Sequence, residues 1–253
     1  MPLSFPSHLA PVLPLKLWRP RWFDGVALAT GTVAPDVAYL TTGTGVQVTG
    51  THTVAALLWW CLPVALGYAW LVRHCAATVA PYLPAGYRWA AELRVRRHRW
   101  WITVGSALLG AVSHLGWDWL THTDGWLHAL GVDWYAVTGL HWWTVSDLSS
   151  SLLGAVAVVI LARRFARRPA NVDRPGRRDT YGATPARPVV FRRVAATVAV
   201  VGVALLPLFP AAREPAPTGV RLLHLVALAA LLGALAANRA ASERTGRLEP
   251  EQR

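Results

Sequence analysis

The stretch Thr53–Val72, TVAALLWWCLPVALGYAWLV, runs for 20 residues without a charged side chain. A helix rises about 1.5 Å per residue, so a segment of this length crosses the hydrocarbon core of a bilayer, which is about 30 Å thick. The stretch therefore predicts a membrane-spanning helix, with a kink at Pro63 because proline cannot donate a backbone hydrogen bond.

Four more stretches share this apolar character. They are Ile102–Leu120, Leu148–Ala162 with its uncharged extension Trp142–Ser146, Val194–Ala212 and Leu222–Asn238. The chain of 253 residues is 54% apolar and only 15% charged, with a mean hydropathy of +0.33, which excludes a disordered chain, a collagen-like fibre and a secreted disulfide scaffold. We expect an all-α polytopic membrane bundle of about five transmembrane helices.

The N-terminal region contains two weaker apolar stretches, Ser7–Trp18 and Val26–Leu40. Both are too short, or too interrupted by glycine and proline, to predict a span. The region also lacks the charged start, apolar centre and cleavage site of a signal peptide. We expect interfacial or re-entrant helices here, packed against the bundle.

Arginine and lysine are unevenly distributed over the segments between the expected spans. Three segments, 73–99, 163–193 and 239–253, hold 20 of the 25 basic residues, and the segments that alternate with them hold five. Basic loops stay in the cytoplasm, so these three segments are predicted to be cytoplasmic in a multi-pass membrane protein.

The basic segments raise the question of a nucleic-acid partner, because the net charge is +12. No nucleic-acid-binding motif accompanies them, and we prefer retention in the cytoplasm with attraction to anionic membrane lipids. The expected organisation is a membrane domain over 1–165, a basic loop over 166–193, two further spans over 194–238 and a basic tail over 239–253.

Three ionisable side chains lie in or beside the second stretch. His114, Asp118 and His122 are spaced i, i+4 and i+8, which places them along one face of a helix. A charged group within the membrane costs at least about 2.5 kcal/mol, so something must compensate Asp118. The predicted topology puts further candidates on the same, outer side: His8, Asp36, His52, Asp124, His128 and His141.

Imidazole and carboxylate groups together suit Zn²⁺ or another divalent transition metal. A buried ion pair that holds helices together is the structural alternative, and the His-xxx-Asp spacing alone favours it. The sequence contains no GxxxxGK[ST], GxSxG or HExxH motif, which leaves nucleotide hydrolysis and serine-type acyl transfer unsupported. Activation of water by a bound metal is the chemistry these side chains suit best.

Eight short segments form a recognisable set: Pro2–Phe5 (PLSF), Ser7–Ala10 (SHLA), Val12–Leu15 (VLPL), Gly31–Tyr39 (GTVAPDVAY), His52–Thr53, Ser113–Asp118 (SHLGWD), Thr121–His122 and Ser150–Gly154 (SSLLG). Together they resemble a family of bacterial inner-membrane proteins known as domain of unknown function 4184. The resemblance covers roughly the first 165 residues. The family is similar to inner-membrane proteins described as metal-dependent hydrolases, and more distantly to zinc phospholipase C and P1-type nucleases.

The resemblance implies a ligand set for a divalent metal, with zinc as the first candidate. The set is His8, Asp36, His52, His114, Asp118 and, at its edge, His122. Asp36 and Asp118 are the carboxylates expected to take part in catalysis. Asp147 stands where the family pattern leads us to expect glutamine, and the later His/Glu ligand pair of zinc phospholipase C has no clear match.

Two functions follow. The first is a metal-dependent hydrolase at the outer membrane face that acts on a phosphoester or other lipid-like substrate. The second is a non-enzymatic bundle whose His/Asp network serves helix packing or the passage of protons or ions. Bis-histidine haem ligation is a weaker third option, because haem does not need the carboxylates.

Overall fold

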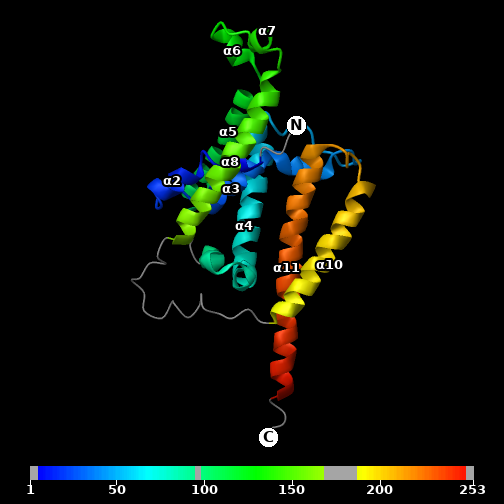
Figure 1. The fold of residues 1–253 in the computed structure, drawn as a ribbon. Coiled ribbons are helices and arrows are strands. Elements are labelled where there is room, and N and C mark those ends of the chain that lie inside the picture. The colour runs from blue at the N-terminus through cyan, green and yellow to red at the C-terminus, as the bar shows by residue number, and fades with distance from the viewer. Residues whose placement is uncertain (1–4, 95–97, 168–186, 249–253) are drawn as a thin grey trace. The chain divides into compact units, whose positions relative to one another are not determined.

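The structure is a computed structural model that describes residues 5–94, 98–167 and 187–248 (Figure 1). Within these ranges the regular structure is entirely helical. The chain forms two compact units: Met1–Trp70 with His98–Arg164 and Arg213–Val220, and Leu71–Arg97 with Phe165–Ala212 and Arg221–Arg253. The expected all-α fold is confirmed.

Three helices are long and apolar enough to cross a membrane. They are α8 (Trp142–Arg167), α10 (Pro188–Leu205) with the short 3₁₀ helix η5 (Leu206–Leu208), and α11 (Pro215–Leu248). The apolar windows run over Trp142–Arg164, Pro188–Leu208 and Pro215–Glu243. They contain or largely overlap the last three of the five expected spans. The segment 168–186, most of the expected basic loop, and residues 249–253 of the expected tail lie outside the described residues.

The first two expected spans are helical, but neither is among the helices that could cross a membrane by length and composition. The stretch Thr53–Val72 begins with turns, continues as a π-helix, η2 (Leu57–Cys61), and becomes regular only in α4 (Leu62–Val79), which carries Arg73 and His74. The other stretch lies within α5 (Trp100–His122), which carries His114 and Asp118. The count of five spans is therefore not confirmed; three are found among the described residues.

The N-terminal region forms short helices, as expected from its interrupted apolar pattern. They are α1 (Phe5–Leu9), α2 (Leu13–Trp18), α3 (Gly25–Val33) and the 3₁₀ helix η1 (Pro35–Thr41). None is long enough to cross a bilayer, which takes about 20 residues. Lys16 stabilises the turn between α2 and α3, because its ammonium group donates to the carbonyl oxygens of Pro20 at 2.7 Å and Phe23 at 2.8 Å.

Helix α3 packs directly against α5 through small residues. A Cβ atom at Gly31 would overlap the carbonyl oxygen of Ala107, and one at Gly110 would overlap that of Leu28. Small residues allow helix backbones to approach this closely, as in many membrane proteins. The contact fixes the position of α3 along α5.

Asp24 caps the start of α3. Its Oδ1 accepts from the backbone N–H groups of Val26 at 3.2 Å and Ala27 at 3.3 Å, and its Oδ2 accepts from the hydroxyl of Thr103 on α5 at 2.8 Å. The carboxylate thus satisfies two of the otherwise unpaired donors at the helix start and joins them to the neighbouring helix.

Helix α8 contacts both α5 and α1. Trp142 donates its indole N–H to the carbonyl oxygen of Leu120 at 2.7 Å, so the start of α8 lies beside the end of α5. Between them the chain forms α6 (Gly125–Ala129) and α7 (Trp134–Thr138), beyond the ends of the two long helices (Figure 1). Further along α8, a Cβ atom at Gly154 would collide with the backbone of Ser7, so α1 lies directly on α8 at this glycine.

In the second unit, the turns η3 (Ala80–Tyr82) and η4 (Ala85–Arg94) follow α4. Helices α10 and α11 run antiparallel, since Gly202 lies against Leu225 and Gly233 against Phe191. This unit holds two of the three candidate spans, and all six side chains expected to form the metal site belong to the first unit.

Candidate metal centre

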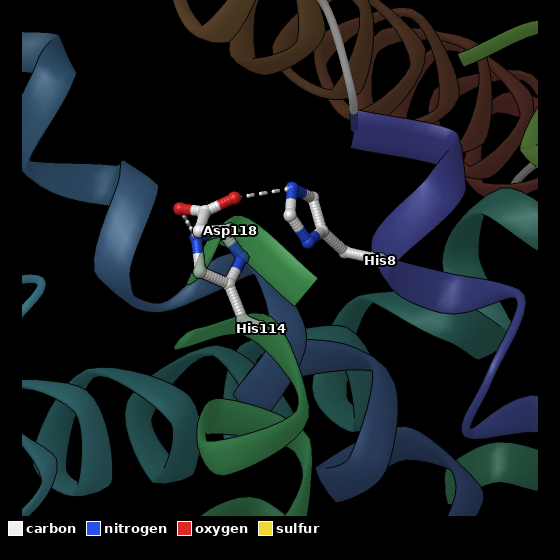
Figure 2. Close-up of side chains that lie close together, drawn as sticks. All are labelled: His8, His114 and Asp118. Atoms are coloured by element: carbon white, nitrogen blue, oxygen red, sulfur yellow. Dashed lines mark ion pairs between the residues drawn. The ribbon is translucent and has the colours of Figure 1, made fainter. Parts of the chain in front are cut away.

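The six residues of the expected ligand set come from four parts of the first unit. His8 lies on α1, Asp36 on η1, and His52 in the turn before η2. The remaining three, His114, Asp118 and His122, follow one another along one face of α5, as their spacing predicts. Figure 2 shows His8 and His114 on either side of the carboxylate of Asp118.

Asp118 lies at the centre of the cluster. Its Oδ2 is 3.2 Å from Nε2 of His114 and 3.6 Å from Nε2 of His52. Its Oδ1 is 3.4 Å from Nε2 of His8 and 3.5 Å from Nδ1 of His122. Each carboxylate oxygen therefore faces two imidazole nitrogens.

Asp36 completes the cluster on the side of His52. Its Oδ1 is 3.1 Å from Nε2 of His52 and 3.5 Å from Nε2 of His114, and the two Nε2 atoms are 3.3 Å apart. Zinc binds nitrogen and oxygen at about 2.0–2.2 Å, which puts neighbouring ligand atoms about 3.0–3.5 Å from each other. The separations around His52 and His114 fall in or close to this range, so these atoms could hold a metal ion.

The backbone of α3 determines which nitrogen of His114 faces the cluster. Nδ1 donates to the carbonyl oxygen of Thr32 at 2.7 Å, since a carbonyl can only accept. In a neutral ring Nε2 is then unprotonated, and it is the atom that faces Asp36, His52 and Asp118. A backbone carbonyl that orients a histidine in this way is typical of metal sites.

Burial is graded across the cluster. The side chains of His114 and His8 are 0% and 2% exposed, whereas that of His52 is 31% exposed. The most exposed side of the cluster is therefore that of His52. The ring of Tyr39 also lies on this side, 5.8 Å from that of His52.

Burial shifts the pKa of two groups at the cluster that lie outside the long helices, His8 and Tyr39. It lowers the pKa of His8 to about 4, helped by the neighbouring His114 and opposed by Asp118 and Asp36. It raises the pKa of Tyr39 to about 12, with a further contribution from the charges of Asp36 and Asp118. His8 is thus neutral at neutral pH, as a metal ligand must be.

Three other candidates from the sequence lie elsewhere. Asp124 and His128 face each other at 3.7 Å as a solvent-exposed pair at α6. His141 stacks between Tyr135 at 4.8 Å and Trp143 at 4.1 Å between ring centroids. These residues form local contacts in the segment between α5 and α8.

Sequence reasoning missed the role of Asp147. This aspartate on α8 is buried, and its Oδ1 lies 3.0 Å from Nε2 of His122. The sequence showed only that an aspartate replaces the expected glutamine, and the pairing with His122 depends on the packing of α8 against α5. Asp24 was missed as well, although an aspartate immediately before a helix is a recognisable cap signal.

One known family matches the chain. The family described as Domain of unknown function (DUF4184) matches residues 1–239. The match extends beyond the 165 residues of the resemblance seen in the sequence and includes α10 and most of α11. No curated protein and no solved structure matches the chain.

Proposed function

Because the chain belongs to the DUF4184 family, whose description assigns no activity, we propose its function from the candidate metal centre. The protein is a membrane-embedded, metal-dependent hydrolase. Its metal is a divalent cation, with zinc as the first candidate, and its substrate is a phosphoester or another ester of a lipid-like molecule.

The observation that carries this proposal is the convergence of ligand atoms around Asp36, His52 and His114. The separations of 3.1, 3.3 and 3.5 Å among them are close to those of atoms that share one metal ion. Asp118 adds a second carboxylate next to His114. Histidine with carboxylate is a common donor set of zinc and related cations.

The exposure of His52 supports a reactive site over a purely structural one. Structural zinc sites are closed, whereas catalytic sites keep a position open to water and substrate. A bound divalent cation would supply positive charge that lowers the pKa of water and stabilises the charge developing on an ester oxygen. Asp36 lies at the same accessible side and is the carboxylate placed to accept a proton from that water.

The position of Asp147 supports a substrate from the membrane. It is the sixth residue of α8, about 8 Å from the start of a helix that could span a bilayer, and it contacts His122. The cluster therefore lies near one end of a candidate span, at the depth of lipid headgroups. A lipid-like ester could reach it laterally.

The proposed location is a bacterial inner membrane, with several passes and the basic segments in the cytoplasm. Arginines gather at the end of α8, the start of α10 and the end of α11, which are the ends that alternating passes would put on one side. Because the candidate metal centre lies near the opposite end of α8, the proposal assigns it to the outer face.

The test is metal analysis of the detergent-purified full chain by inductively coupled plasma mass spectrometry. A His114→Ala/Asp118→Ala variant is compared with Asp124→Ala/His128→Ala, which removes the exposed pair with the same i, i+4 spacing. We expect near-stoichiometric zinc, manganese or iron in the wild type and in the exposed-pair variant, and a loss of the ion in the other.

Hydrolysis is then measured with bis(p-nitrophenyl) phosphate, p-nitrophenyl acetate and a fluorogenic phospholipid. Turnover that requires the ion and disappears with His114 and Asp118 supports the hydrolase. A wild type that binds none of the added cations makes the cluster a polar network for helix packing. Ion binding with no turnover of any ester overturns catalysis and leaves a metal-binding protein.

A further inference from the structure

Two contacts hold the turn between α2 and α3 beside the start of α5. Before the turn, the ammonium group of Lys16 donates to Nε2 of His98, just ahead of α5, at 3.1 Å. After the turn, Oδ2 of Asp24 accepts from the hydroxyl of Thr103, in the first turn of α5, at 2.8 Å. The residues between these contacts therefore lie on the same surface as the first residues of α5.

Exposed tryptophan and arginine side chains gather on this surface. The end of α2, the turn after it and the start of α5 supply the residues that we call the Trp/Arg patch: Trp18, Arg19, Arg21, Trp22, Arg99, Trp100 and Trp101. Its tryptophan side chains are between 50% and 73% exposed. A large exposed apolar surface of this kind marks a contact with a partner or with a membrane.

The arginines of the patch carry charge that the fold does not neutralise. Within the described residues, no ion pair joins Arg19, Arg21 or Arg99 to a carboxylate. The guanidinium groups of Arg19 and Arg99 lie 5.0 and 5.1 Å from the ring centroids of Trp18 and Trp101. A cation over the face of a ring keeps N–H donors for other partners, so the patch can still bind an anion.

The other end of α5 carries tryptophan but no basic residue. The segment 122–146 that follows contains no lysine or arginine, and its carboxylates are Asp124 and Asp133. Trp119 and Trp143 are exposed at this end. The helix has 23 residues and is about 35 Å long, close to the thickness of a bilayer core. Tryptophan at both ends suits two membrane surfaces, and arginine at one end suits the anionic cytoplasmic leaflet.

We propose that the Trp/Arg patch is a binding surface for anionic phospholipid headgroups of the cytoplasmic leaflet. The tryptophan rings lie at headgroup depth, and the guanidinium groups donate to the lipid phosphates. The inference uses the orientation proposed above but neither the metal nor hydrolysis. It also moves Lys16, Arg19 and Arg21 to the cytoplasmic side, away from His8, although all four belong to the N-terminal region.

The first test measures the affinity of the detergent-purified full chain for lipids. The protein is titrated with phosphatidylglycerol or phosphatidylcholine, and bound lipids are counted by native mass spectrometry. Each basic residue at an anionic membrane surface strengthens binding roughly fivefold, so Arg19→Gln/Arg21→Gln/Arg99→Gln should weaken the tightest phosphatidylglycerol binding about 100-fold. Phosphatidylcholine binding should change little, because its headgroup has no net charge.

The matched control removes the same charge from exposed arginines of α10 and α11. Arg192→Gln/Arg193→Gln/Arg239→Gln should retain phosphatidylglycerol binding within about fivefold of the wild type. Equal losses in the two triple variants would show that net charge, rather than this surface, attracts the lipid, and would overturn the proposal.

The second test locates the lipid by tryptophan fluorescence in nanodiscs. Brominated phosphatidylglycerol should quench the wild type more than brominated phosphatidylcholine does. This excess should disappear in Trp18→Phe/Trp22→Phe and persist in Trp119→Phe/Trp143→Phe, which changes exposed tryptophans at the other end of α5. An excess that persists in the first variant would overturn the proposal.

Nucleic acid is the competing ligand, because arginine and tryptophan also bind single strands by phosphate contacts and stacking. A single-stranded oligonucleotide should not relieve the quenching by brominated phosphatidylglycerol. Relief at micromolar oligonucleotide would assign the patch to nucleic acid instead. None of these measurements involves a metal ion, so the proposed function and the lipid surface can fail independently.

Discussion

His114 donates its Nδ1–H to the carbonyl oxygen of Thr32 across 2.7 Å, and this bond links α5 to α3 at the base of the candidate metal centre. The ring is fully buried, so it cannot exchange this partner for water. Nδ1 of the imidazole therefore stabilises the packing of α3 on α5, whereas Nε2 faces the cluster. A mutation can remove one of these contacts and keep the other.

His114→Asn retains a donor close to the position of Nδ1 but has no atom at Nε2. We expect it to fold with little loss of stability and to bind zinc at least about 100-fold more weakly, since a ligand is lost rather than a supporting contact. His114→Leu should lose both stability and zinc binding. The carbonyl of Thr32 is then buried without its donor, which should lower the free energy of unfolding by about 1–3 kcal/mol. Thermal unfolding in detergent and zinc titration calorimetry distinguish the two. Wild-type zinc affinity in His114→Asn would contradict the assignment of Nε2 as the ligand atom.

Gly110→Ala tests the contact of α3 with α5. A Cβ atom there would overlap the carbonyl oxygen of Leu28, a backbone atom that cannot move aside alone. We expect a loss of about 1–3 kcal/mol or more, because overpacking forces the helices apart. Gly105→Ala is the matched control on the same helix, since a Cβ atom there meets nothing within 4 Å. Equal stability of the two variants in chemical unfolding would show that the helices do not pack at Gly110.

Asp24→Ala removes a cap that also joins two helices. The variant loses the acceptor of the Val26 and Ala27 N–H groups and of the Thr103 hydroxyl, all in a buried position. We expect a cost of about 2–3 kcal/mol, at or above the upper end for an ordinary cap. Asp133→Ala removes the exposed cap of α7, which accepts only from Ala136 at 2.9 Å, and should cost about 1 kcal/mol or less. Unfolding free energies measured side by side provide the comparison.

The stability of the metal-free protein should depend on the protonation of His8. Burial lowers the pKa of His8 to about 4, below the 6.5 of an unfolded chain, so between these values the unfolded state binds a proton that the folded state does not. The free energy of unfolding is therefore unaffected by this group above about pH 6.5 and decreases as the pH falls toward 4. The difference between the two pKa values corresponds to a total decrease of about 3 kcal/mol. His8→Gln should flatten this part of the curve. An equal slope in wild type and variant, measured by unfolding at pH 7, 6, 5 and 4.5, would contradict the burial of a neutral His8.

Periodicity in the sequence correctly predicted how three of the candidate residues are placed. The spacing of His114, Asp118 and His122 placed them on one face of α5, and the structure brings all three together. The predicted topology made His8 and Asp36 candidates, but only the family resemblance put them in the ligand set, because no spacing rule connects residues on different helices. The partner of Nδ1 of His114 is a backbone carbonyl of α3, and such an acceptor cannot be recognised from residue types.

Only some of the predicted membrane spans agree with the structure. The segments of α10 and α11 are rich in Ala, Val and Leu and were identified as spans from this composition alone. A span was predicted in α5, but His114 and Asp118 reduce the apolar character of this helix, and it is not among the helices that could cross a membrane by length and composition. In α4, Arg73 and His74 interrupt the apolar run in the second half of the helix.

The close approach of Ser7 to Gly154 has a consequence for how the protein is made. Synthesis proceeds from the N-terminus, so His8 emerges well before Gly154 of α8, the glycine that accommodates its helix. The centre can therefore be completed only after α8 has been translated and has reached α5. Until then the nascent chain carries the candidate ligands without a finished site, so under the proposed function a metal would be acquired late in biogenesis.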